Sequence, residues 1–445
     1  MTHKHSPVTA LRNAAQPLDG GAHDYDALLD CIGDARFVLL GEATHGTHEF
    51  YRERARITRR LISERGFDAV AIEADWPDAH RVDRFVKGRL GDDDAALSLA
   101  SFERFPTWMW RNADFLDFVG WLREHNDARP PEAGKVGIYG LDLYSLQRSI
   151  AAILAFLDRV DPEAAARARE RYGCFGKFGD DLTSYAYGLG IAESCEGDAL
   201  QQLLEVRQKT LEQATKPGTT DPDELFYVTQ NALLVRNAER YYRCMLHGSV
   251  ATWNIRDRHM ADTLSEIAQH VDHLTGRPSK IVVWAHNSHV GDARATQLGE
   301  RGELNVGQLV RERYDRDAFL VGFTTYDGTV TAATDWDGPA ERFALRPALP
   351  DSYEELLHAA EIPRFALLPD RARRLPGALM NERLERAVGV VYRPRTERAS
   401  HCFRARLAHQ FDAVLHFDRT RAVEPLERFA PERGPDAPET FPFAV

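Results

Sequence analysis

The chain has 445 residues, of which 43% are hydrophobic and 28% charged, and its formal net charge is −12. This composition is typical of a globular protein and excludes a collagen-like repeat or a largely disordered chain. The negative charge argues against a nucleic-acid partner, because binding to phosphates needs a basic surface. A single hydrophobic core usually stops growing at about 250–300 residues, so we expect a core domain with a substantial insertion.

No apolar run approaches the roughly 20 residues that a membrane helix needs, so no membrane partner is expected. The N-terminal segment MTHKHSPVTALRNAAQPLDG is too polar for a signal peptide, which predicts a cytoplasmic protein. The cysteines are odd in number and form no C-x-x-C pair, so we interpret them as reduced packing residues. They are Cys31, Cys174, Cys195, Cys244 and Cys402. The sequence gives no indication of the oligomeric state.

Short apolar runs alternate with helical patterns along the chain. Near-continuous apolar runs are typical of strands that are buried on both faces. The predicted strands are 35–40, 67–74, 135–140, 280–285, 318–323, 365–368, 388–392 and 412–417. The helical patterns between them include 48–65, 111–126 and 145–158. This alternation predicts an α/β fold with a mostly parallel central sheet flanked by helices. The turn-like segment TYDGTVTAA (325–333) leaves room for an antiparallel portion.

Residues 161–250 show no strand pattern, and we interpret them as a helical insertion. The α/β core then comprises residues 1–160 and 251–445. Predicted helices in and after the insertion are 163–172, 198–214, 223–247 and 253–273. A helical excursion that leaves a sheet and returns to it is suited to form part of a substrate cleft. The alternative is a helical layer that only completes the core.

Titratable residues follow four of the predicted strands. In an open parallel sheet, ligands bind beyond the carboxyl ends of the strands, where the loops converge. Acids and imidazoles delivered to one edge by four strands therefore predict a functional site there. In chain order these residues are Glu42 and His45, Glu73 and Asp75, Asp142, and His286 and His289.

His45 is the candidate general base, because an imidazole can accept a proton at neutral pH. A carboxylate such as Glu42 or Glu73 would fix its tautomer and stabilise the imidazolium that forms. The alternative is that His45 only makes a hydrogen bond in the turn, while Thr44 or Thr47 caps the following helix.

Two arginines lie early in the predicted helix 48–65. Arg52 and Arg54 point in directions about 200° apart, so at most one of them faces the predicted site. A guanidinium there would pair with Glu42 or Glu73, or bind a substrate carbonyl.

The spacing H-x-x-H occurs twice, at His45/His48 and His286/His289, and raises a metal-dependent hydrolase as an alternative. Neither segment is H-E-x-x-H, and a transition from strand to loop supports this geometry less well than a regular helix. A second alternative is a non-catalytic protein that binds a small ligand.

Other catalytic motifs are missing from the sequence. There is no G-x-S-x-G nucleophile turn, no G-x-G-x-x-G after the first strand and no phosphate-binding P-loop. A water molecule activated by His45, with no cofactor and no bound metal, is therefore the leading hypothesis.

Four segments in order resemble the erythromycin esterase family, and the similarity extends over most of residues 30–420. They are VLLGEATHGTHEFYRERARITRRLISERGFDAVAIEADW, GIYGLDLYS, WNIRDRHMA and VVWAHNSHVGDARA. The resemblance implies a mixed α/β core with helical insertions and a deep cleft. It also implies that a histidine acts as the general base in hydrolysing an ester without a metal.

Carried over by motif, the resemblance implies a role for each candidate residue. His45 would be the base, Glu42 and Glu73 its acidic partners, and Arg54 the arginine that follows the first motif. His286 and His289 would position water or substrate, or donate to the developing oxyanion. The remaining candidates, for substrate binding, are Asp75, Asp142 and Arg256, with Asp257 beside the last.

The best-known members of this family open macrolide lactone rings and so confer antibiotic resistance. The wording E-A-T-H-G-T-H-E-F-Y is more similar to an uncharacterised branch of the family. We therefore expect a small-molecule ester or lactone as the substrate, without a specific expectation of macrolide cleavage.

Overall fold

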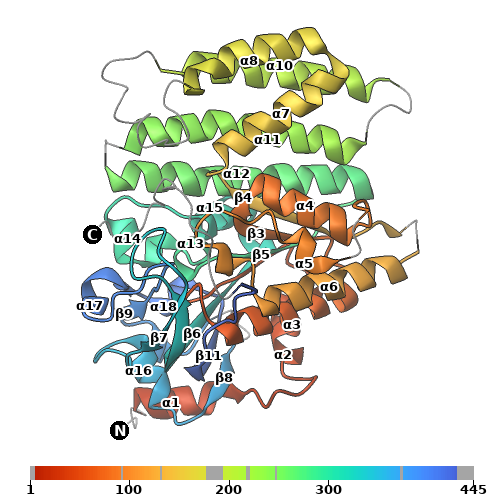
Figure 1. Ribbon diagram of the computed structural model, residues 1–445. Helices are drawn as coiled ribbons and strands as arrows, with labels where there is room; N and C mark the ends of the chain where they lie inside the picture. Colours follow the sequence, from red (N-terminus) through yellow and green to blue (C-terminus); the bar gives the residue numbers. More distant parts are fainter. Residues whose placement is uncertain are drawn as a thin grey trace.

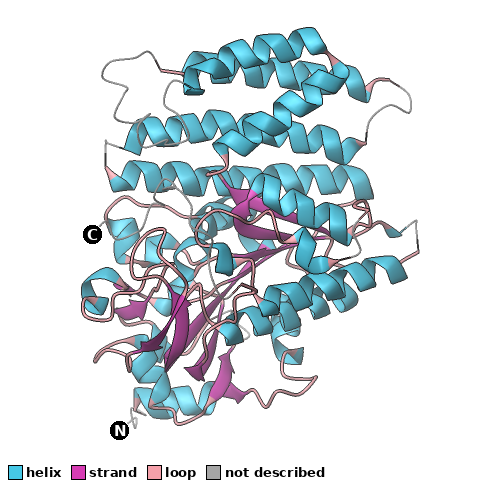
Figure 2. Ribbon diagram, in the orientation of Figure 1, coloured by secondary structure: helices cyan, strands magenta, loops and turns pink. Residues whose placement is uncertain are grey.

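A computed structural model describes residues 6–91, 94–130, 133–176, 194–216, 221–245, 248–370 and 374–427. Its centre is a nine-stranded sheet, drawn in magenta in Figure 2. In spatial order the strands are β1 (Ala15–Pro17), β8 (Arg364–Leu367), β11 (Ala413–Thr420), β6 (Ala318–Ala332), β2 (Phe37–Leu40), β5 (Ile281–Trp284), β3 (Ala69–Asp75) and β4 (Gly137–Asp142), with β7 (Glu341–Leu345) beside β6. A separate two-stranded sheet joins β9 (Arg383–Arg386) to β10 (Cys402–Ala405).

The sheet is mostly parallel, which confirms the predicted α/β class. All neighbours from β11 to β4 pair in parallel, whereas β1, β7 and β8 pair in antiparallel fashion. The turn-like segment 325–333 was expected to leave room for an antiparallel portion, and its residues 328–332 pair in antiparallel fashion with β7; they do so as part of β6 and not as a turn. The strand expected at 388–392 is wrong: Val388 and Val391 make only isolated bridges, to Thr44 and Ala333.

Both faces of the sheet are covered, which explains the continuous apolar strands. In β2, Phe37 and Leu39 belong to one core, and Val38 and Leu40 belong to the other. The second core includes side chains of α2 (Asp26–Ile32), α3 (His48–Arg65), α4 (Trp76–Val86) and α6 (Ala113–Ala128). The first includes side chains of α7 (Leu146–Val160), α11 (Pro222–Cys244), α12 (Ser249–Thr275) and α15 (Val306–Tyr314).

The long helices stack in layers away from the β4 edge of the sheet (Figure 1). Helix α12 contacts β4, α11 lies on α12, and α10 (Glu196–Ala214) lies on α11, with α8 (Pro162–Gly176) beside α10. The helices predicted within 161–275 are thus confirmed over the described residues, while 177–193, 217–220 and 246–247, the last at the end of the predicted helix 223–247, lie outside them. The bounds of the insertion and its role in a cleft stay predictions. No helix within the described residues is long and apolar enough to cross a membrane.

The remaining helices are short. They are α1 (Pro7–Ala14), α5 (Ala95–Ser98), α13 (Asn287–Val290), α14 (Gln297–Glu300), α16 (Tyr353–His358), α17 (Glu397–Ser400) and α18 (Leu407–Gln410). Of these, α13 follows β5 directly and carries part of the second H-x-x-H segment.

The expectation that all cysteines are reduced is wrong for one pair. Cys174 in α8 and Cys195 at the start of α10 form a disulfide, with Cα atoms 5.9 Å apart. The pair is 21 residues apart in sequence, and only the packing of α8 against α10 brings it together. Cys31, Cys244 and Cys402 are not part of this disulfide.

Gly46 holds the turn after β2 against two distant segments. Its carbonyl accepts hydrogen bonds from the backbone N–H groups of Thr331 (3.0 Å) and Val423 (2.9 Å). A Cβ atom at position 46 would lie 1.8 Å from the Thr331 carbonyl oxygen, a distance that no side chain can tolerate. The approach of these three backbone segments therefore requires glycine.

We expect Gly46→Ala to lower the free energy of unfolding by about 3 kcal/mol, because the backbone must shift to accept the methyl group. Gly120→Ala is the matched control, since Gly120 lies inside α6 and a Cβ there meets nothing within 4 Å. That control should raise stability by up to about 1 kcal/mol, through helix propensity. Urea unfolding of both variants tests the difference, and equal midpoints would contradict it.

Candidate active site

The register of three strands brings the candidate residues to the carboxyl end of the sheet. Leu40 and Ile72 both lie opposite Trp284, so β2, β5 and β3 end level with one another. The residues that follow, including Glu42, Glu73 and His286, therefore emerge side by side at the carboxyl end of the sheet. This placement is the one that the strand ends predicted.

His45 is buried in the turn after β2 and is held by a carboxylate. Its Nδ1 lies 2.8 Å from Oε1 of Glu42, and only 5% of the residue is exposed. The other oxygen of Glu42 lies 2.7 Å from Nη2 of Arg54, which is fully buried. Imidazole, carboxylate and guanidinium thus form one buried chain of charge-assisted contacts.

Aromatic rings surround the guanidinium at the end of this chain. Arg54 lies 4.5 Å from the ring centre of Tyr51 and 5.1 Å from that of Trp284. Arg52 faces the other way, half-buried, and pairs with Glu53. The structure therefore places one of the two arginines at the site, and that residue contacts Glu42 from behind.

Glu73 connects three separate parts of the chain. Its Oε1 accepts a hydrogen bond from Nη2 of Arg256 at 2.9 Å and lies 3.3 Å from Nε2 of His289. Its Oε2 accepts the backbone N–H of His286 at 2.8 Å. Burial would raise the pKa of Glu73, but His289, His45 and Arg256 lower it well below its ordinary value. Glu73 is thus a buried carboxylate, and its hydrogen bonds go to Arg256 and the backbone of His286.

Arg256 also pairs with a second carboxylate, that of Asp142 at the end of β4. Its Nε and Nη2 donate to the two oxygens of Asp142 at 3.0 and 2.7 Å. Burial would raise the pKa of Asp142, and Arg256 reverses this and lowers it. The bidentate pair fixes the guanidinium between β3 and β4, and Asp142 has both oxygens occupied within the protein.

His286 is kept neutral close to His45. The two ring centres are 4.8 Å apart. Burial, followed by the nearby His45, lowers the pKa of His286 well below its ordinary value. Its Nδ1 accepts the backbone N–H of Ser288 at 3.2 Å, so the proton of the neutral ring lies on Nε2. Within the described part of the chain, that Nε2 makes no hydrogen bond of normal geometry, although the backbone of Ala43 interacts with the ring and opposes the lowering of its pKa.

His289 carries a positive charge, in contrast to His286. Burial would lower its pKa, but the carboxylates of Asp257 and Glu73 raise it to about 9. Nδ1 lies 2.8 Å from Oδ1 of Asp257, and the ring stacks on Trp253 with centres 4.5 Å apart. The imidazolium therefore neutralises buried carboxylates on both sides.

The two H-x-x-H segments do not assemble into one cluster. His48 turns away from His45 and pairs with Asp114 at 2.8 Å, with a quarter of its side chain exposed. His45 and His289 already contact carboxylates through Nδ1. In the ranges that the structure describes, no three His, Cys, Asp or Glu side chains are arranged to hold a metal ion. This geometry does not favour the metal-dependent alternative.

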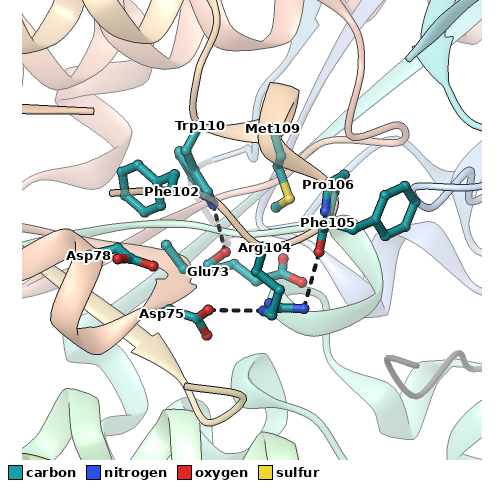
Figure 3. A pocket seen from close by; sticks show the side chains of 10 residues that line it. Glu73, Asp75, Asp78, Phe102, Arg104, Phe105, Pro106, Met109 and Trp110 are labelled. Atoms are coloured by element: carbon teal, nitrogen blue, oxygen red, sulfur yellow. Dashed lines mark hydrogen bonds and ion pairs between the residues drawn. The ribbon is translucent and has the colours of Figure 1, made fainter. Parts of the chain in front are cut away.

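A small cavity adjoins the site on the side of Glu73 (Figure 3). It has a volume of about 30 Å³, and Asp75, Asp78 and Arg104 line it with an apolar wall that includes Phe105 and Trp110. A larger cavity of about 440 Å³ lies at the opposite edge of the sheet, beside Asp68 and Val136 at the amino ends of β3 and β4. The acids and imidazoles described above do not line the larger cavity.

The structure brings most of the predicted residues together, but the sequence prediction missed several of their partners. Glu42, His45, Glu73, His286 and His289 meet at one edge, with Arg54, Asp142 and Arg256 behind them. Asp75 lies two residues beyond Glu73 and pairs with Arg104 at 2.9 Å. The missed residues are Asp78, Arg104, Tyr144, Trp253 and Ser288. No strand end and no motif of known spacing marks these residues in the sequence, so only the fold reveals them.

The fold and the site define an α/β protein with a buried acid–base centre at the carboxyl edge of its sheet. Residues 62–420 match the erythromycin esterase family. The chain belongs to this family. It is 23% identical over 403 residues to erythromycin esterase type II from Escherichia coli, covering 84% of this chain and 92% of that protein.

Solved structures show the same fold. A structure described as a succinoglycan biosynthesis protein superposes with a TM-score of 0.73 at 19% identity, covering 95% of this chain and 99% of that one. A mutant erythromycin esterase in its open conformation superposes with a TM-score of 0.61 at 17% identity, covering 89% and 93%. Together with the family assignment, the similarity to the curated esterase supports a hydrolase of esterase-like type.

The raised pKa of His289 predicts a pH-dependent contribution to stability. The folded pKa of about 9 lies above the ordinary value of 6.5, so the folded protein binds this proton more tightly. The resulting stabilisation, on the order of 3 kcal/mol, is fully present below about pH 6.5 and is lost as the pH rises through 9. The difference in unfolding free energy between wild type and His289→Gln should therefore shrink from pH 6 to pH 9.5.

His273→Gln is the control for this measurement, because His273 is exposed on the same helix as Asp257. Its unfolding free energy should stay within about 0.5 kcal/mol of wild type, as is usual for a surface substitution. A pH-independent difference for His289→Gln would show that His289 is not an imidazolium in the folded protein.

Proposed function

We propose that this protein hydrolyses a carboxylic ester or lactone, with His45 as the general base that activates water and with no metal or organic cofactor. The observation that carries the proposal is the buried chain from Arg54 through Glu42 to His45, with the neutral ring of His286 4.8 Å away. Such a chain prepares one imidazole nitrogen to accept a proton.

The Glu42 contact decides which nitrogen of His45 is basic. Nδ1 donates its proton to Glu42, so the lone pair of the neutral ring lies on Nε2. Water gives a proton to Nε2 while its oxygen attacks the carbonyl carbon and the carbonyl π electrons move to oxygen. Glu42 stabilises the imidazolium that forms, and the contact with Arg54 holds Glu42 in place.

Nε2–H of His286 is suited to donate to the oxyanion of the tetrahedral intermediate. It is a buried donor whose own ring stays neutral, and it makes no hydrogen bond of normal geometry within the described residues. The His45 imidazolium then returns its proton to the leaving alkoxide as the C–O bond breaks. The products are a carboxylic acid and an alcohol, or one hydroxy acid when the substrate is a lactone.

Glu73, Arg256 and Asp142 support this chemistry without a proton transfer of their own. Glu73 holds the backbone of His286, and Arg256 fixes Glu73 through Asp142. We assign these three residues as positioning residues, and His289 as the charge that balances Glu73. The buried pairs are strongly interdependent, because removing one partner leaves the other charge unpaired.

His45→Ala should lower kcat on a responsive ester or lactone by about 10² or more, through loss of the general base. His48→Ala is the matched control, since His48 belongs to the same H-x-x-H segment but pairs with Asp114 at the rim. It should leave kcat within about threefold of wild type, as expected for a partly exposed ion pair. Turnover of a panel of esters and lactones, with and without chelator, measures both effects.

The alternatives predict different results in the same series. A metal-dependent hydrolase loses activity with chelator, and the two histidine variants fall together. A binding protein shows no turnover with any member of the panel, and its affinity for ligands is unchanged in His45→Ala. Either outcome would overturn the assignment of His45 as a metal-independent base.

A further inference from the structure

We infer that Asn287 is a positioning residue, whose side-chain amide sets the distance between the rings of His286 and His45. The inference rests on the proposed function for the roles of these two rings. The contacts that carry it are a separate observation, because they join Asn287 to β6 and to the turn after β2 and not to the rings themselves.

Strand β6 loses its β2 neighbour beyond Val321. Leu40, the last residue of β2, lies opposite Val321, and the N–H of Gly41 donates to the Val321 carbonyl at 2.9 Å. The chain then leaves the sheet. Phe323 lies two residues further along β6, so its backbone N–H and C=O point to the same side as those of Val321. Phe323 is fully buried, and these two groups need another partner.

The amide of Asn287 takes the place of the missing strand. Its Nδ2 donates to the Phe323 carbonyl at 2.8 Å, and its Oδ1 accepts the Phe323 N–H at 3.3 Å. Nδ2 also lies 3.3 Å from Oε1 of Glu385. Asn287 is fully buried. Because a primary amide carries a donor and an acceptor, as a peptide group does, it completes both hydrogen bonds of Phe323 with one side chain.

The space for this amide depends on the glycine that follows β2. A Cβ atom at position 41 would lie 2.1 Å from Oδ1 of Asn287 and 3.1 Å from the Val321 carbonyl oxygen. With a methyl group there, the amide could not keep its hydrogen bonds to Phe323. Gly41 and Asn287 therefore fit together where β2 leaves the sheet.

Asn287 connects this anchor to both imidazoles. Its backbone N–H donates to the carbonyl of Glu42 at 2.8 Å, and the carboxylate of Glu42 holds His45. His286 immediately precedes Asn287, at the start of the four-residue helix α13. The side chain thus ties this turn to β6, while the backbone ties it to the partner of His45. Together with the hydrogen bond from the His286 backbone to Glu73, these contacts set the 4.8 Å between the ring centres.

Asn287→Ala tests this role by separating rate from binding. Without the amide the turn that carries His286 shifts, so kcat on a responsive ester or lactone should fall roughly 10- to 100-fold. KM should change far less, because the amide is fully buried and its hydrogen bonds go to Phe323 and Glu385. Steady-state kinetics on the folded variant measure both quantities.

Asn126→Ala is the matched control. The Asn126 amide also bonds to the N–H and the C=O of a single residue, Val136, at 2.8 and 2.9 Å, and Asn126 is equally buried. It lies in α6 beside the amino end of β4, away from the candidate site. Both variants should lower the urea midpoint by similar amounts, but Asn126→Ala should keep the kcat of the wild type. Equal kcat values for the two variants would overturn the inference.

The nuclear Overhauser effect between the ring protons of His45 and His286, in protein labelled at histidine, reports their separation. The wild type and Asn126→Ala should show this effect, because the ring centres are 4.8 Å apart. Asn287→Ala should lose it. Gly41→Ala, which retains Asn287 but displaces its amide, should lose it as well. An unchanged effect in either of these two variants would overturn the inference, whatever the change in kcat.

The two measurements separate this inference from the proposed function. Loss of the Overhauser effect in Asn287→Ala, with no wild-type turnover of any ester or lactone, would overturn the proposed function and support the role of Asn287 in setting the distance. Wild-type turnover that depends on His45, with kcat and the Overhauser effect both unchanged in Asn287→Ala, would overturn the positioning role alone.

Discussion

The burial of Glu73 as a charged group is the constraint on which the rest of the site depends. A carboxylate in the interior needs partners for both oxygens, and Glu73 finds them in α12, in α13 and in the backbone after β5. Those partners bring together segments that are far apart in sequence, as the separation of 183 residues between Glu73 and Arg256 shows. The position of His286 against His45 follows, because the Glu73 carboxylate holds the His286 backbone.

This arrangement separates the electrostatic roles of three imidazoles. His289 lies between Asp257 and Glu73 and remains charged, whereas burial, followed by the nearby His45, lowers the pKa of His286 and keeps it neutral. His45 has a carboxylate partner of its own in Glu42, which is balanced in turn by Arg54. A neutral donor, a charged anchor and a candidate base thus coexist within one buried cluster because each has different nearest partners.

Much of the fold could be predicted from the sequence, and the reasons are physical. Helix α3 has the bounds expected from its pattern, and β2, β3, β4 and β5 were visible as continuous apolar runs. Strands β7 and β9 were missed because charged residues interrupt ERFAL and RLER. The disulfide between Cys174 and Cys195 depends on helix packing, which spacing alone does not reveal.

The sequence predicted which residues lie together at the strand ends. It did not predict which of their side chains contact one another. Strand ends identified Glu42, Glu73 and the histidines, since parallel strands end at one edge. Whether Glu42 or Glu73 supports His45 depends on side-chain direction, and the sequence left both open. The structure gives the hydrogen bond to Glu42 and engages both oxygens of Glu73 elsewhere.

The buried carboxylates of Glu73 and Asp142 are fully engaged within the protein. Every oxygen of Glu73 and Asp142 contacts an arginine, a histidine or a backbone N–H, so neither carboxylate has an obvious acceptor left for a ligand. Of the three acids carried by β3 and β4, Asp75 alone has a buried oxygen that no donor reaches within the described residues. Contacts to a bound molecule must then come from groups other than these two carboxylates. In this arrangement the paired charges hold the buried cluster together, while residues between Phe102 and Trp110 line the small cavity beside Glu73.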